Sequence, residues 1–171
     1  LVIAAGVFAV LACLYVTLRH HYVSGLTLFV SLSVGVALTS ALVLITRMPI
    51  TANLLYTLFF NLLFTAVCTM FTLNKVRKAQ KEDKKIDAET LVNSNLAVWQ
   101  VLSFAAACVI ALVFVGAIAT SAVRWFAAIS LLSVVAGVFA SLFFAPALYL
   151  IVKKYTDEKA AERARYDYKR S

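Results

Sequence analysis

The stretch that decides the fold is residues 50–85, which read ITANLLYTLFFNLLFTAVCTMFTLNKVRKAQKEDKK. Residues 54–73 contain no charged residue and no proline. That is about 20 residues, the length that an α-helix needs to cross roughly 30 Å of hydrocarbon. A block of lysines and arginines follows at once, and such a block marks the cytoplasmic end of a membrane span. Residues 54–73 are therefore predicted to cross a membrane as a helix.

This predicted span carries polar side chains along one face. Four recur at intervals of four, three and four residues: Asn61, Thr65, Cys68 and Thr72. Three more widen the stripe: Asn53, Thr57 and Thr69. Because a polar group in lipid needs a hydrogen-bond partner, we expect this face to point at other helices. Two interpretations stay open. Helix packing is favoured, since each hydroxyl can also bond a carbonyl of its own helix; the other is a polar path for a substrate or an ion.

Composition extends the membrane interpretation to the whole chain. Of its 171 residues, 63% are hydrophobic, and the mean hydropathy is +0.92, which is typical of multi-span membrane proteins. The net charge of +8 would suggest nucleic acid for a soluble protein. Here the charges lie beside the apolar runs, so anionic lipid headgroups are the expected partner, and no nucleic-acid partner is predicted.

The apolar runs predict an all-α, polytopic membrane bundle of about five transmembrane helices. The expected spans are residues 2–17, 26–45, 54–73, 96–119 and 126–152, so residues 1–152 form the bundle. Residues 75–95 are expected to form a basic cytoplasmic loop, either solvated or holding a surface helix, and residues 153–171 a partly disordered cytoplasmic tail. Because Leu1 is not an initiator methionine, we expect the chain to be a fragment of a longer protein.

Local breaks refine these limits. Gly25 is expected to open the second span, Pro49 to end it with Thr51 capping the next helix, and Pro146 to kink the last. The adjacent histidines at 20 and 21 favour an interfacial turn over a metal site, because neighbours on a helix point about 100° apart.

The basic residues predict the orientation. Of the 16 lysines and arginines, only Arg47 and Arg124 fall on the two short turns of one side, and the other fourteen fall on the opposite side if five spans alternate. The N-terminus of the chain is then outside and its C-terminus in the cytoplasm. The proposed topology anchors are Arg19, Lys75, Arg77, Lys78, Lys153 and Lys154.

No residue pattern for catalysis is present. Every Asp and Glu lies within residues 82–89 or 157–167, so no span core holds the ionisable group that a proton relay needs. The three cysteines lie in apolar runs and behave as small hydrophobes. We therefore predict no enzyme activity, catalytic residue, cofactor, metal or disulfide.

Several short motifs resemble a known family. Thr65, Thr69 and the Val76-Arg77 pair match the register of the signature G-Y-S-I-N-D-T-x-V-V-x-D-R-I-R-E. Shorter matches are Leu14-Tyr15-Val16 leading to Arg19, Met48-Pro49-Ile50-Thr51 before Leu54, Leu91-Val92-Asn93-Ser94, and the series Gly116, Phe126, Gly137, Ser141 and Ala145. On these motifs, nearly the whole chain resembles the membrane half of SecF, the small subunit of the SecD–SecF complex of bacterial protein export.

The chain departs from this family at the charged positions. Val67 and Cys68 stand where the signature has an intramembrane Asn-Asp pair, and Asn74 stands where it has an Asp. Uncharged residues also stand at the family's His-Asp pair (Gly35 and Val36) and at its Arg-Thr pair (Leu102 and Ser103). The resemblance thus implies the family's fold without its proton relay.

The resemblance implies a divergent SecF-like subunit of the bacterial cytoplasmic membrane that assists translocation, paired with a SecD-like subunit and the Sec translocon. Its support of the partner's spans is expected to use the face formed by Asn61, Thr65, Cys68 and Thr69 as the helix interface. Two alternatives stay open: a fragment of a resistance-nodulation-division transporter of lipids or drugs, and a structural membrane subunit that transports nothing.

Overall fold

The computed structural model describes residues 2–20, 22–47, 53–82 and 98–168, and within these ranges the chain is helical without a strand. The elements are α1 (Val2–His20), α2 (Tyr22–Ile45), α3 (Asn53–Glu82), α5 (Val98–Ile118), α6 (Ser121–Phe139), the π-helix η1 (Ala140–Phe144) and α7 (Ala145–Tyr168). The predicted all-helical bundle is confirmed.

Four helical stretches of the described chain are long and apolar enough to cross a bilayer. They are Tyr22–Ile45, Leu54–Val76, Val98–Ile118 and Val123–Thr156, the last of which runs through α6, η1 and α7. The apolar part of α1, Gly6–Leu18, is shorter. It overlaps the first predicted span, and each of the four longer stretches overlaps one of the other four predicted spans.

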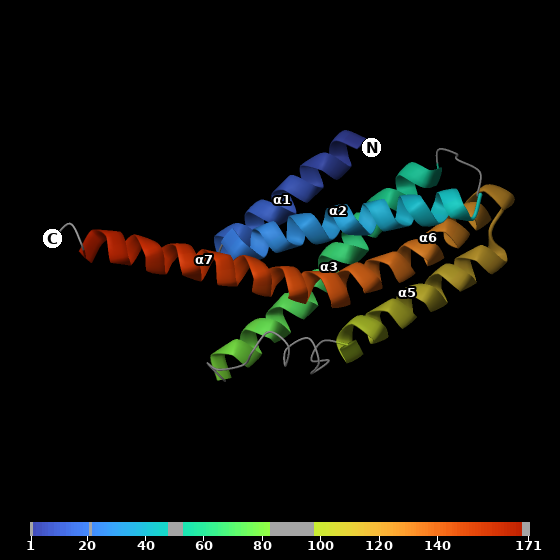
Figure 1. Cartoon of the computed structure of the whole chain (residues 1–171). Helices are drawn as coiled ribbons and strands as arrows, with labels where there is room; N and C mark the ends of the chain where they lie inside the picture. Colours follow the sequence, from blue (N-terminus) through green and yellow to red (C-terminus); the bar gives the residue numbers. More distant parts are fainter. Residues whose placement is uncertain (1, 21, 48–52, 83–97, 169–171) are drawn as a thin grey trace.

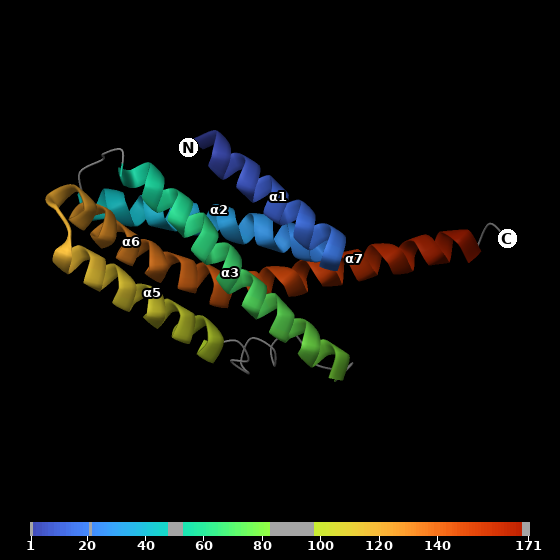
Figure 2. The same cartoon turned by 180° about the vertical axis from the view of Figure 1, so that it is seen from behind.

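Helix α3 lies at the centre of the bundle (Figure 1). It packs most extensively against α6 and α2, while α1 lies against α2 on one side and α5 lies against α6 on the other. Figure 2 shows the same order from behind, with α1 and α5 at opposite edges. The stretch that decides the fold in the sequence is thus a helix that contacts every other helix of the bundle, with one side left uncovered in Figure 2.

The prediction that Gly25 opens the second span is wrong. Helix α2 begins at Tyr22, so Gly25 lies inside it, buried against Thr17 of α1. A side chain at position 25 would occupy the place of the Thr17 hydroxyl. Gly25 therefore allows α1 and α2 to pack closely against each other, and it does not interrupt α2.

Helix α3 also extends further than its apolar run. It continues from the membrane-spanning part through the basic residues to Glu82, so the first part of the predicted loop is helix. Lysine, arginine, glutamine and alanine are good helix formers, which explains the extension. The rest of that loop, and the predicted break at Pro49 and Thr51, lie outside the described residues.

A π-helical turn separates α6 from α7. The N–H of Ala145 donates to the carbonyl of Ala140, five residues back, and Pro146 follows at once. Proline lacks an N–H and its ring crowds the carbonyl four residues earlier, so a wider turn before it relieves that crowding. Figure 1 shows the chain changing direction between α6 and α7, as expected for Pro146. Beyond this point the tail, expected to be partly disordered, continues as helix to Tyr168.

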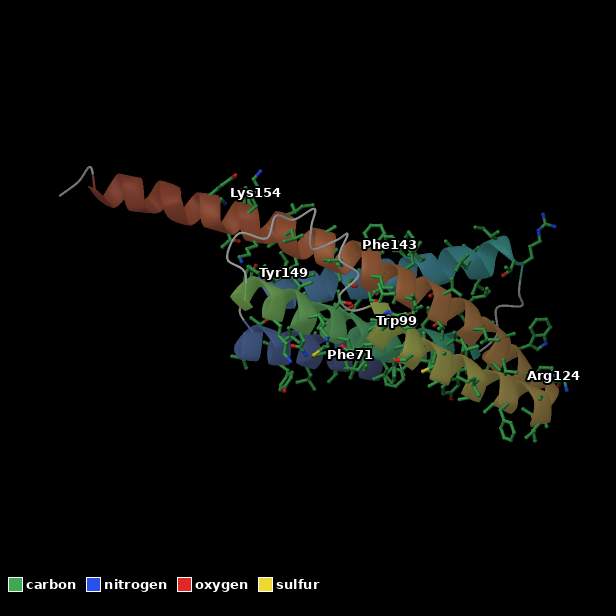
Figure 3. The ribbon with its side chains drawn as sticks, turned by 90° about the horizontal axis from the view of Figure 1, so that it is seen from below. Phe71, Trp99, Arg124, Phe143, Tyr149 and Lys154 are labelled. Atoms are coloured by element: carbon green, nitrogen blue, oxygen red, sulfur yellow. The ribbon has the colours of Figure 1, made fainter. Side chains whose placement is uncertain are left out.

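The two ends of the bundle differ in charge. Figure 3 shows Arg124 at the end opposite to Lys154 of α7. Arg47, in the turn after α2 and with a positive φ of 51°, lies at the Arg124 end, because α2 ends where α6 starts. At the other end, Leu73 and Val76 of α3 pack on Tyr149 of α7, and the lysines that follow them gather there.

Candidate functional site

The interior of the bundle holds a polar core, by which we mean Ser31 and Thr39 of α2, Thr57, Asn61, Thr65 and Thr69 of α3, and Ser130 and Ser133 of α6. All eight side chains are at most 1% exposed. In a protein surrounded by lipid, buried polar groups are expected to bond one another across helices. This cluster is therefore the candidate functional site of the chain.

Asn61 is the hub of the polar core. Its Nδ2 donates to the carbonyl of Gly35 at 2.9 Å and to the hydroxyl of Thr39 at 2.7 Å, both on α2. Its Oδ1 accepts a hydrogen bond of 2.9 Å from the hydroxyl of Thr65, one turn further along α3. Both amide protons and the carbonyl oxygen of this fully buried side chain are thus satisfied.

A second bond and two glycines complete the contact. The hydroxyls of Ser31 and Thr69 lie 3.0 Å apart and join α2 to α3 two turns from Asn61. Between these bonds, Thr65 is held on both sides by glycine. A Cβ at Gly35 would lie 3.0 Å from its Oγ1, and a Cβ at Gly137 of α6 would lie 2.9 Å from it. Only helices without side chains at these two points can approach α3 so closely.

Cys68 does not share in this network, although it belongs to the predicted polar stripe. It is buried in an apolar cluster with Phe64 of α3, Val101 of α5 and Val134 of α6. The ring of Phe64 stacks on that of Phe104, with centroids 5.5 Å apart, and so ties α3 to α5. The stripe is therefore divided: Asn61, Thr65 and Thr69 bond inside the polar core, and Cys68 packs among hydrophobic side chains.

The face formed by Asn61, Thr65, Cys68 and Thr69 is not free to receive a partner, which corrects one expectation from the sequence. Each of the four side chains is at most 1% exposed, and the helices that cover them are α2, α5 and α6 of the same chain. The sequence of one helix shows which face is polar but not which helix covers that face. An internal contact therefore cannot be distinguished from a contact with a partner by sequence alone.

The predicted topology anchors lie at one end of the bundle. Lys78 and Lys154 are exposed, and Lys75 and Lys153 are partly buried. All four lie within five residues of Leu73, Val76 or Tyr149, which form the packed contact between α3 and α7. The side chains of Arg19 and Arg77 lie outside the described part of the chain. Long cationic side chains beside an apolar core reach toward lipid headgroups.

Four members of the polar core are not among the candidate residues predicted from the sequence: Ser31, Thr39, Ser130 and Ser133. Ser130, Ser133, Gly137 and Ser141 recur at intervals of three or four, which places them on one face of the helix. That spacing was the available signal, and the family motif includes only its second half, Gly137 and Ser141.

The chemistry that this arrangement can support is limited. Among the described residues, the buried polar side chains are serine, threonine and asparagine, without a buried Asp, Glu, Lys, Arg or His. No group of three His, Cys, Asp or Glu side chains gathers as metal ligands in the same part of the chain. Hydroxyls and an amide can hold helices together and bind neutral polar molecules, but they do not take up or release protons near neutral pH.

A family model identifies the chain. The model described as "Protein export membrane protein SecD/SecF, C-terminal" matches residues 1–155. The chain belongs to the SecD/SecF C-terminal family. No curated protein and no solved structure matches it. The family and the apolar helices together make this SecD/SecF chain a multi-pass membrane protein.

The structure locates the departures from the family signature within this SecD/SecF chain. Cys68, which stands where the resemblance puts an acidic residue, is fully buried between α3, α5 and α6. Val67 beside it points outward and is 38% exposed. Gly35 stands where the resemblance puts a histidine, and there it lets α2 contact Thr65. Cys68 and Gly35 are thus positions of close packing, and Val67 is not.

Proposed function

We propose that this chain is a SecF-like subunit of the bacterial protein-export machinery in the cytoplasmic membrane, without catalytic activity of its own. It works beside a SecD-like subunit and the Sec translocon, and it assists translocation through contact with the partner's helices and without a proton relay of its own. The membership of the SecD/SecF family supports the export role. The motifs around Thr65 and Thr69 favour SecF over SecD.

The observation that carries this proposal is the neutral polar core. The helix that bears the family signature lies at the centre of the bundle, and its buried side chain Asn61 bonds to Gly35, Thr39 and Thr65. A proton relay at membrane depth needs a group that changes charge. An amide bonded to hydroxyls provides rigid packing between helices, which suits a subunit that supports a partner.

Contact with the partner must then use the outer faces of the bundle, because the inner face of α3 is filled. The described outer faces are apolar, including Ile110, Phe114 and Ile118 of α5. Apolar faces suit both lipid and a neighbouring helix. We place the lysine-rich end in the cytoplasm, where Lys75, Lys78, Lys153 and Lys154 meet anionic headgroups.

The test is a co-purification experiment combined with a proton-flux measurement. The tagged full chain is expressed with the SecD-like subunit and the translocon in bacterial membranes, solubilised gently and purified. We expect the SecD-like subunit to co-purify in a fixed ratio. Failure of that subunit to co-purify, while the chain itself is folded, would refute the assignment.

The flux arm uses the purified chain in liposomes with an imposed pH gradient and a pH-sensitive dye inside. We expect the gradient to decay at the rate of empty liposomes, because no buried residue of the described chain titrates as a relay. A decay that is faster with the chain, and that disappears in the Asn61→Leu variant, would contradict the absence of a relay. Export of a lipophilic dye from the same liposomes would favour a transporter of the resistance-nodulation-division class.

A further inference from the structure

Two hydroxyls of the polar core make no hydrogen bond to the part of the chain that the structure describes. They are the Oγ atoms of Ser130 and Ser133 on α6, and both are buried. Other hydroxyls of this chain bond a carbonyl of their own helix, as Thr72 does to Cys68 and Ser141 does to Val138. Ser130 and Ser133 do not make such a bond to their own helix.

The direction of these two side chains follows from Gly137. An α-helix turns about 100° per residue, so Ser133 and Ser130, four and seven residues before Gly137, lie within about 40° of it around the axis. Gly137 faces α3, because a Cβ there would lie 2.7 Å from Phe64 and 2.9 Å from Thr65. Both serines therefore face α3 in the interior of the bundle.

The level of the two serines along the bundle is also fixed. Helices α3 and α6 begin at the same end of the molecule and run in the same direction (Figures 1 and 2). Gly137 is level with Thr65, so one turn earlier Ser133 is level with Asn61, and two turns earlier Ser130 is level with Thr57. The unpartnered hydroxyls are thus directed at the Asn61 network.

We propose that Ser130 and Ser133 bind buried water between α3 and α6, as part of the polar core. A buried hydroxyl without a hydrogen bond is costly, and a buried water typically bonds about three polar groups. Each serine offers one donor and two acceptor positions, and Asn61 Oδ1, which accepts the bond from Thr65, has a second acceptor position. This inference does not depend on the proposed function.

The ligand is water and not a cation. Desolvating a cation is far more costly than desolvating water unless charged ligands compensate. The described polar core contains hydroxyls and one amide, without a carboxylate. A neutral molecule that both donates and accepts hydrogen bonds is what these groups complement.

The first test is solid-state NMR of the full chain, labelled with ¹³C-serine and reconstituted in phosphatidylethanolamine and phosphatidylglycerol liposomes. Magnetisation is transferred from water protons to the serine side chains. The matched control is Ser141, equally buried but bonded to its own helix; single Ser→Ala variants assign the three signals. We expect transfer to Ser130 and Ser133 to be several-fold faster than to Ser141. Equal rates at all three serines would overturn the proposal.

The second test uses the sign of a stability change. In the double variant Ser130→Ala and Ser133→Ala, a hydrated site loses its water and the bonds that the water makes, so the apparent melting temperature falls by more than in Ser141→Ala. If the hydroxyls are dry and unbonded, the same variant removes two unfavourable buried groups, so the melting temperature rises or stays unchanged. Either of those two results would overturn the proposal.

Discussion

The side-chain amide of Asn61 donates a 2.9 Å hydrogen bond to the backbone carbonyl of Gly35. This bond joins the centre of α3 to the backbone of α2, and it needs the two helices to be close. That closeness exists because position 35 has no side chain; a Cβ there would already be in tight contact with Thr65. The amide and the glycine are therefore two parts of one contact, and changes to either should have related effects.

Asn61→Leu should lower the free energy of unfolding by about 1 to 2 kcal/mol, since interhelical bonds in membrane proteins contribute roughly 0.6 kcal/mol each and two hydroxyls also lose their partner. The measurement is unfolding by a denaturing detergent in lipid bicelles. Thr72→Val is the control, because Thr72 bonds only its own helix, to the carbonyl of Cys68. If both variants lose the same stability, the Asn61 network does not hold the bundle together.

Gly137→Ala should destabilise the chain although alanine is the better helix former. The new methyl group would lie 2.7 Å from the Phe64 ring, and such overpacking costs about 1 to 3 kcal/mol, against a gain in helix propensity of about 1 kcal/mol. Gly6→Ala is the control, because nothing lies within 4 Å of that position. We expect Gly6→Ala to leave the melting temperature unchanged or raise it, and a similar rise in Gly137→Ala would argue against the α3–α6 contact.

Arg47→Gly should stabilise the chain by up to about 1 kcal/mol. Arg47, in the turn after α2, has a φ of 51°, a left-handed conformation that is unfavourable for residues with a Cβ and ordinary for glycine. Arg47→Ala removes the same charge but keeps the Cβ, so it should bring no such gain. A melting temperature that rises equally in both variants would assign the effect to charge and not to the backbone.

Deleting Phe143, combined with Pro146→Ala, should leave the bundle folded. The π-helix Ala140–Phe144 holds one residue more than an α-helical turn, so removing one residue restores α-helical bonding without shifting α7. Phe143 faces outward and is 58% exposed, so its loss leaves no cavity. Deleting the equally outward Val135 would turn Gly137 about 100° away from α3 and should lower the melting temperature much further. Equal losses in the two deletions would contradict this account.

The apolar runs of the sequence were enough to predict an all-helical membrane bundle. The span predicted at residues 96–119 is α5, Val98–Ile118, because a membrane helix is set by the length of its apolar run. The start of α2 was predicted wrongly, because a glycine at the edge of an apolar run is typical of a helix boundary. Only the packing of Gly25 against Thr17 of α1 shows that it lies inside the helix. The π-turn was missed as well, since Pro146 predicts a bend but not how the backbone before it adapts.

The candidate site was predictable only in part, because it is made by contact between helices. The period of Asn61, Thr65 and Thr69 was visible in one helix, but their partners Ser31, Gly35 and Thr39 are on another. Nothing in the spacing of α3 distinguishes a face filled by the chain's own α2 and α6 from a face left for another subunit. That distinction is a property of the packed bundle.

The neutrality of the Asn61 network has a consequence for how the bundle responds to the energy of the membrane. A group without net charge does no electrical work when it moves across a transmembrane voltage. Its bonds to Gly35, Thr39 and Thr65 should therefore be equally strong in energised and de-energised membranes. A voltage can act on this network only through charged groups elsewhere, such as Lys75 and Lys78 further along α3.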